Sequence, residues 1–202
     1  MSAQKNKQDN TPPRIGVLAL QGAVQAHHPH IEAGGAVFCP VKTPQDFQSV
    51  DAFILPGGES TTMLKLIDVF DLKEPLAKAF AQKPVWGICA GAILIARTVS
   101  NPSQFSFDLL PIHIRRNAYG AQKESVFCDV AGIDAPFIRA PIIERTDPSV
   151  CILAKRGDDP VWVRYHTYMA TTFHPELSKT TPSPMHQFFV DEIVKPSLTK
   201  GH

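Results

Sequence analysis

Short apolar runs alternate with segments of helical periodicity in the first half of the chain. Four runs have the length and composition of strands buried on both faces: residues 14–20 (RIGVLAL), 36–41 (AVFCPV), 51–55 (DAFIL) and 84–89 (PVWGIC). The segments between and after them have helical character: residues 23–33, 60–72, 75–82 and 90–99. This alternation predicts an α/β fold with a largely parallel central sheet.

The second half of the chain has a different pattern, from about residue 105 onward. Short strand-like segments follow one another between turn residues: 109–116, 124–130, 136–143, 149–156, 161–166 and 168–173. A helix at about residues 184–194 closes the chain. We therefore expect one domain over residues 14–197 with a more strand-rich C-terminal half, preceded by a flexible polar tail of residues 1–13.

Composition excludes several classes of protein. Lys plus Arg (20) nearly balances Asp plus Glu (19), so no basic excess indicates nucleic acid or an anionic membrane as a partner. No apolar run reaches the roughly 18 residues of a membrane span, and the first residues lack the apolar core of a signal peptide. The four cysteines include no CxxC pair, which argues against a disulfide framework or a structural zinc site. We expect a cytoplasmic protein without a metal.

Cys89 stands in WGICAGA, where a buried strand passes into a helix. Ligand sites of open α/β sheets lie at the carboxyl ends of strands, and a residue on a tight strand-to-helix turn projects its side chain there. Gly87 and Gly91 then have a reason to be small. A core cysteine beside packing glycines explains the same pattern, so Cys89 alone leaves both interpretations open.

Two other predicted strand ends carry chemistry that a cysteine nucleophile needs. His174 and Glu176 follow the strand-like residues 169–173, and could supply a base with a carboxylate to orient it. The loop PGGES (56–60) follows another strand, and its glycines leave backbone N–H groups free to approach an oxyanion or a carboxylate.

Together these loops resemble the triad-type (class I) glutamine amidotransferases, whose flavodoxin-like three-layer fold the resemblance implies. More specific blocks are similar to the glutaminase branch of pyridoxal 5′-phosphate synthases, in the same order along nearly the whole chain. These blocks are LALQGA (18–23), LPGGEST (55–61), WGICAG (86–91), RRNAYG (115–120), FIRAP (137–141) and FHPEL (173–177).

The resemblance implies a Cys-His-Glu triad that hydrolyses L-glutamine to L-glutamate and ammonia through a thioester. Cys89 is then the nucleophile, His174 the general acid/base and Glu176 the residue that orients it. Backbone N–H groups of Gly58 and Ala90 are the implied oxyanion donors. The implied glutamine-binding residues are Gly57, Gly58, Glu59, Ser60, Arg116, Ile138 and Arg139.

The resemblance also implies a partner, a synthase subunit of TIM-barrel fold that receives the ammonia for vitamin B6 synthesis, and no cofactor. Gln21, Gly22 and His27 match the surface that meets this partner. The helix after LQGA departs from the family, because Ala26 replaces a usual glutamate and Pro29 follows. Either this helix begins late or its first turn is distorted.

Further departures lie away from the triad. Ala121 replaces a usual arginine, and the segment before Phe137 is short. Two other functions stay open: a catalytically weak or silent regulatory subunit of the same complex, or an amidotransferase subunit of another pathway such as histidine biosynthesis. The intact Cys89, His174 and Glu176 favour catalysis, and the PGGEST and FIRAP blocks favour the vitamin B6 branch.

Overall fold

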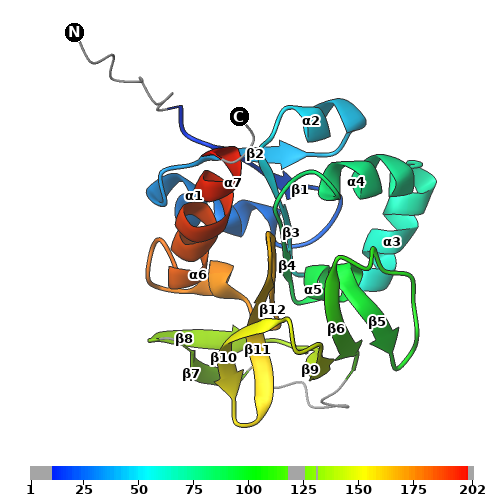
Figure 1. The fold of residues 1–202 in the computed structure, drawn as a ribbon, viewed down its shortest axis with the longest axis vertical. Coiled ribbons are helices and arrows are strands. Elements are labelled where there is room, and N and C mark those ends of the chain that lie inside the picture. The colour runs from blue at the N-terminus through cyan, green and yellow to red at the C-terminus, as the bar shows by residue number, and fades with distance from the viewer. Residues whose placement is uncertain (1–10, 118–125, 131, 200–202) are drawn as a thin grey trace, which may run out of the picture.

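The computed structural model describes residues 11–117, 126–130 and 132–199. A mainly parallel sheet forms its centre (Figure 1). Its seven strands are β1 (Arg14–Leu18), β2 (Val37–Val41), β3 (Ala52–Leu55), β4 (Val85–Ile88), β10 (Cys151–Arg156), β11 (Asp159–Tyr165) and β12 (Tyr168–Thr171), in the order β10-β11-β12-β4-β3-β1-β2. Neighbours from β12 to β2 are parallel, whereas β10, β11 and β12 pair antiparallel. The predicted, largely parallel central sheet is confirmed.

Helices cover both faces of this sheet and make the fold three-layered (Figure 1). On one face lie α1 (His28–Ala33), α6 (Pro184–Phe188), a π-helical segment η3 (Phe189–Val194) and α7 (Lys195–Thr199). On the other lie α3 (Ser60–Val69), α4 (Lys73–Phe80) and α5 (Ala90–Ile95), with the short α2 (Pro44–Gln48) beside α4. Alternate residues of a strand enter different cores: Phe53 and Leu55 pack under α3 to α5, whereas Ile54 packs with Trp86 under α6.

Two small sheets account for the strand-rich second half. One has the order β5-β6-β9, formed by β5 (Ala96–Ser100), β6 (Leu110–Arg115) and β9 (Ile142–Thr146). The other is a hairpin of β7 (Val126–Val130) and β8 (Ile133–Phe137). Both lie below the carboxyl ends of β3 and β4 in Figure 1, so their loops can wall a site at that edge.

The helix predicted over residues 90–99 is too long. Helix α5 ends at Ile95, and Ala96 is already extended (φ −64°, ψ 153°). The β-branched Thr98 and Val99 pair in parallel with His113 and Ile114 of β6. Sheet pairing far along the chain therefore overrides the local helical pattern, because β-branched residues fit a pleated surface.

The segment predicted as a helix over residues 23–33 is divided in two. A 3-10 turn, η1 (Val24–His27), precedes α1, and Pro29 stands in the first turn of α1. A proline there loses no intrahelical hydrogen bond, since first-turn N–H groups have no intrahelical acceptor. The α-helix thus begins late, which is one of the two alternatives that Pro29 raised.

The predicted tail lies mostly outside the described residues. Its last residue, Pro13, is buried, and the Pro13 carbonyl accepts a hydrogen bond from Val37 N at 2.8 Å. The sheet therefore holds the chain just before β1 begins. In the described part of the chain, no helix is both long and apolar enough to span a membrane.

Candidate active site

Cys89 occupies the turn between β4 and α5. Its backbone has φ +48° and ψ −100°, outside the ordinary regions for a residue with a side chain, and its N–H donates to Thr171 O at 2.8 Å. A Cβ added to Gly91 would lie 2.0 Å from Leu55 O, and one added to Gly87 would lie 2.5 Å from Gly91 O. Both glycines are required by close backbone approach, so the strained turn is held by the strands around it.

His174 lies beyond the end of β12, the neighbour of β4. Its N–H donates to Pro136 O at 3.0 Å, which ties the histidine to β8. The side-chain Nδ1–H donates to Glu176 Oε1 at 2.7 Å, because a carboxylate oxygen can only accept. Glu176 stands in the 3-10 turn η2 (Pro175–Leu177), and its side chain is completely buried. His174 also hydrogen-bonds Cys89, which completes a Cys-His-Glu chain.

The contact between His174 and Glu176 shifts the pKa of both side chains. Burial lowers the pKa of His174, but hydrogen bonds to Cys89 and Glu176 outweigh it and raise that pKa to about 10. For Glu176, burial would raise the pKa, but the hydrogen bond from His174 leaves it below its ordinary value. The pair therefore holds a protonated imidazole beside an ionised carboxylate.

The glycine-rich loop after β3 lies opposite His174. A Cβ on Gly57 would stand 2.3 Å from His174 Cε1, so the loop backbone closes directly over the imidazole. The Gly57 carbonyl accepts from Ala23 N at 3.1 Å, and Glu59 N donates to Gln21 Oε1 at 3.1 Å. The segment after β1 thus holds the loop through two hydrogen bonds.

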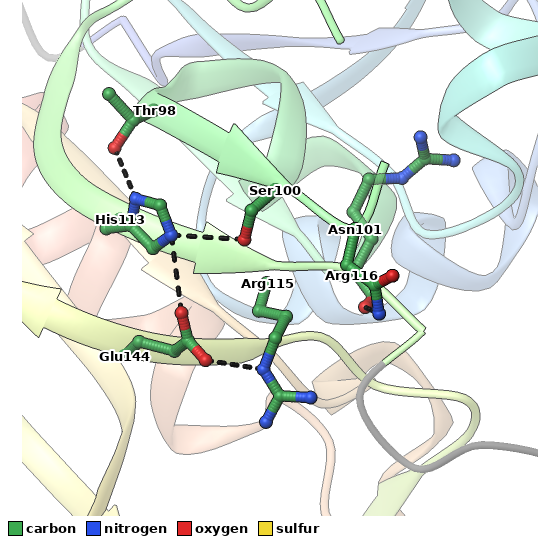
Figure 2. Close-up of polar contacts among 7 residues, drawn as sticks. All are labelled: Thr98, Ser100, Asn101, His113, Arg115, Arg116 and Glu144. Atoms are coloured by element: carbon green, nitrogen blue, oxygen red, sulfur yellow. Dashed lines mark hydrogen bonds and ion pairs between the residues drawn. The ribbon is translucent and has the colours of Figure 1, made fainter. Parts of the chain in front are cut away.

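Arg116 follows β6 directly, and two interactions fix its backbone. Its N–H donates to Ser100 O at 3.0 Å, and its carbonyl accepts from Asn101 Nδ2 at 3.1 Å. The Arg116 guanidinium donates to Thr61 Oγ1 at 2.9 Å. Figure 2 shows the guanidinium of Arg115 pointing the other way, onto Glu144.

Glu144 also contacts His113, whose ring hydrogen-bonds Thr98 and Ser100 across β5 and β6 (Figure 2). In this polar network, Arg115 at the end of β6 pairs with Glu144 of β9 and so joins the two strands. Of the two consecutive arginines, Arg116 is therefore the one on the site.

A pocket of about 290 Å³ collects most of the predicted residues. Its lining includes Cys89, Ala90, His174, the loop 57–60, Arg116, Ile138 and Arg139. Glu176 lies behind His174, away from the lining. Five lining residues were not singled out from the sequence: Ala23, Ile93, Asn117, Pro141 and Leu177. All of them except Ile93 belong to blocks that carried the resemblance, which is the signal that could have found them.

The three residues predicted to face a partner have different positions. Gly22 lines the pocket, and Gln21 holds the glycine-rich loop. His27 is completely buried, so its side chain does not lie on a surface that a partner could touch. Ala121 is outside the described residues. A separate hollow of about 310 Å³ between α2 and α4 contains none of the predicted residues.

Class I glutamine amidotransferases combine a three-layer α/β fold with a cysteine after one central strand and a His-Glu pair after its neighbour. Residues 17–195 match the SNO glutamine amidotransferase family, and the chain belongs to this family.

Known proteins agree with this assignment. The chain is 41% identical to pyridoxal 5′-phosphate synthase subunit PdxT of Solibacter usitatus, over 89% of this chain and 99% of the relative. It is 46% identical to the PdxT subunit of Frankia alni, over 90% and 95% of the two chains. A crystal structure of a glutamine amidotransferase superposes with a TM-score of 0.80 at 35% identity, covering 90% of this chain and 98% of the other.

Proposed function

We propose that this chain is the glutaminase subunit of a pyridoxal 5′-phosphate synthase, and that it works in the cytoplasm. The observation that carries the proposal is the Cys89-His174-Glu176 chain at a pocket that Arg116 also lines. The names of the PdxT relatives support the pathway. The pocket supports a small substrate that has both a carboxamide and a charged end.

The proposed reaction begins with the Cys89 thiol. In the resting site its proton has already passed to His174, and Sγ attacks the carboxamide carbon of L-glutamine as a thiolate. The tetrahedral oxyanion receives hydrogen bonds from the N–H groups of Gly58 and Ala90, a contribution of the order of 10²–10³ in rate for each donor. His174 then gives the proton to the leaving nitrogen, and ammonia departs from a thioester.

The second half of the reaction uses the same residues. His174 removes a proton from water, the resulting hydroxide attacks the thioester carbonyl, and Sγ leaves as L-glutamate forms. The raised pKa of His174 favours the first transfer, because the imidazole is then a strong acceptor for the thiol proton. Arg116 and Arg139 are proposed to hold the glutamine carboxylate, which suits the forked guanidinium. The loop from Gly57 to Ser60 and Ile138 complete the binding site.

We further propose that ammonia passes to a TIM-barrel synthase subunit through a direct protein contact. In bulk water at neutral pH ammonia would be protonated and lose its nucleophilicity. Gln21 and Gly22 are placed to respond to such a contact, since they lie on the segment that holds the glycine-rich loop.

The test measures glutamate release from glutamine by the purified chain, with and without a pyridoxal phosphate synthase subunit. We expect release that the synthase enhances, and its loss in Cys89→Ala. The matched control is Cys151→Ala, which removes an exposed cysteine of β10 and should keep full activity.

Each other outcome favours a different function. No release from the wild-type chain beside a synthase that demonstrably binds would identify a silent regulatory subunit. Release that the synthase does not change would favour an amidotransferase of another pathway.

A further inference from the structure

Behind the triad lies a buried set of polar side chains that the proposed reaction does not use. Three histidines form it: His27 of η1, His30 of α1 and His186 of α6, with exposures of 0%, 2% and 1%. Ser183, the N-cap of α6, is also completely buried. We call these four residues the histidine cluster. Their contacts define which nitrogen of each ring carries a proton.

The orientation of His30 follows from a backbone donor. Ser183 N–H donates to His30 Nδ1 at 3.0 Å, so Nδ1 carries no proton. The proton of the neutral ring is therefore on Nε2, which donates to the backbone carbonyl of Glu176 at 3.2 Å. One member of the cluster thus already holds the backbone of the carboxylate residue.

His186 and His27 continue from the same serine. Ser183 Oγ lies 2.7 Å from His186 Nδ1, and His186 Nε2 lies 2.9 Å from His27 Nδ1. Ser183 Oγ also accepts from His186 N at 3.4 Å, and among the described residues His186 Nδ1 is the acceptor that lies within reach of its hydroxyl proton. His186 then carries its proton on Nε2 and donates it to His27 Nδ1. It follows that the proton of His27 is on Nε2.

Two buried atoms remain at the end of this chain. Among the residues that the structure describes, His27 Nε2 and Glu176 Oε2 have no hydrogen-bond partner. Segments η1 and η2 pack against each other, and burial lowers the pKa of His27 while the nearby Glu176 carboxylate partly opposes that shift. A buried N–H and a buried carboxylate oxygen both require a partner, and one water molecule can bridge groups beyond direct reach.

We propose that His27 is a positioning residue of the active site, whose Nε2–H donates to Glu176 Oε2 through one bridging water. Glu176 is then held at three points: Oε1 by His174, Oε2 by His27 and its carbonyl by His30. In the reverse arrangement the proton would be on His27 Nδ1, and Nε2 would offer the bridging water a lone pair instead of a donor. The hydrogen bonds from Ser183 to His186 and from His186 to His27 therefore determine that His27 presents an N–H donor, and not a lone pair, on the side of Glu176.

The contact itself is tested on the wild-type chain by nitrogen-15 NMR, which distinguishes the two neutral forms of histidine. We expect His27, His30 and His186 all to carry the proton on Nε2 at neutral pH. A His27 with its proton on Nδ1 would overturn the proposal. This measurement needs no enzymatic activity, so it is independent of the proposed function.

The catalytic consequence rests on the proposed glutaminase function and is tested with the synthase present. In His27→Phe, which keeps ring volume but has no donor, we expect kcat to fall about tenfold with KM within about twofold. His27→Gln keeps an N–H donor at the end of the side chain and should recover most of the loss. The control is His28→Phe, whose side chain on the same helix start is about half exposed and should leave kcat unchanged.

The outcomes separate the two proposals. A folded His27→Phe with unchanged kcat would contradict the positioning role. A wild-type chain that releases no glutamate would contradict the proposed function, while the histidine NMR still decides the contact. Should His27→Phe fail to fold, His27→Gln and the wild-type spectrum carry the test.

Discussion

At the scale of single residues, the site depends on His174, whose pKa is lowered by burial and raised by its hydrogen bonds. Burial disfavours the protonated form of His174, and the contacts to Cys89 and Glu176 favour it more strongly, so its pKa is about 10 rather than 6.5. The same histidine must accept a proton from Sγ and later release it to the leaving nitrogen. Glu176 therefore determines both the orientation and the basicity of the ring.

Substitution of Glu176 by Gln tests this dependence. Without the carboxylate charge, one of the two contacts that oppose burial is lost, and the pKa of His174 should fall below its present value of about 10. In glutamate release with the synthase present, we expect kcat to fall on the order of 10²–10⁴-fold, as when another triad loses its carboxylate. An NMR titration of His174 measures the shift in pKa. The control Glu144→Gln removes a carboxylate of the β6–β9 network and should change neither quantity.

At the scale of elements, one local and one distant contact complete the two ends of helix α2. Helix α2 begins at a capping box, in which Thr43 Oγ1 accepts from Asp46 N and Asp46 accepts from Thr43 N. Beyond its other end, Lys83 Nζ donates to the carbonyls of Phe47 at 2.7 Å, Gln48 at 3.2 Å and Val50 at 2.6 Å. These carbonyls would otherwise lack intrahelical donors, so Lys83 joins α2 to the start of β4.

Replacement of Lys83 by Met tests that role. The variant keeps an unbranched apolar stem but loses three charged hydrogen bonds to half-buried carbonyls. We expect the free energy of unfolding to fall by about 2 kcal/mol, measured by urea denaturation. Lys78→Met, an exposed position of α4, is the matched control and should change it by less than about 0.5 kcal/mol. Equal stability of both variants would contradict the assignment.

At the scale of the whole molecule, the histidine cluster joins distant parts of the chain under one face of the sheet. It brings η1 and α1, near the start, against α6, near the end, with Trp86 of β4 beside them. Burial lowers the pKa of His27 to about 4 and that of His186 well below its ordinary value, and it also lowers that of His30. The cluster is therefore neutral in the folded chain at neutral pH.

This neutrality makes folding sensitive to acid. An unfolded histidine binds its proton near pH 6.5, whereas folded His27 binds one only near pH 4. Between these pH values the unfolded chain therefore binds more protons than the folded chain, and the free energy of unfolding decreases as the pH is lowered. His27 alone should account for about 3 kcal/mol of this loss. Glu176, whose folded pKa is lowered, adds a loss only at still lower pH. The shift of His174 is in the opposite direction, and its contribution is complete below pH 6.5 and lost only as pH rises through about 10.

Urea denaturation between about pH 7.5 and about pH 4.5 measures this dependence. We expect the free energy of unfolding to decrease steadily below pH 6.5 in the wild-type chain, and less steeply in His27→Phe. A free energy that stays level over this range would contradict buried, neutral histidines. His28→Phe again serves as the exposed control.

Much of the fold and the position of the site could be predicted because the signals are local. Each apolar run of the first half is a strand, and Cys89, the loop from Gly57 and His174 each follow a strand end. Carboxyl ends of adjacent parallel strands meet at one edge of a sheet, so three separate motifs had to lie close together. The resemblance supplied what local pattern leaves open, namely which chemistry these motifs perform.

Other features depend on contacts between distant segments, which local pattern does not contain. The α5-to-β5 boundary follows from pairing with β6. Arg115 ends β6 and pairs with Glu144 of β9, whereas Arg116 follows the strand and lines the pocket, and this difference depends on how β6 pairs with β9. Cys151 has apolar neighbours in the sequence but is exposed on the edge strand β10, because an edge strand has a partner on one side only.

The order of strands and helices and the strand-end position of the nucleophile follow from local pattern, because apolar periodicity and close-packed glycines act over a few residues. The environment of the histidines after LQGA depends instead on how distant segments pack. Two consecutive residues, His27 and His28, differ strongly in exposure, because His27 at the end of η1 contacts His186 of α6, whereas the side chain of His28 at the start of α1 is about half exposed. Burial at that point depends on which helix packs there, and α6 lies about 160 residues away.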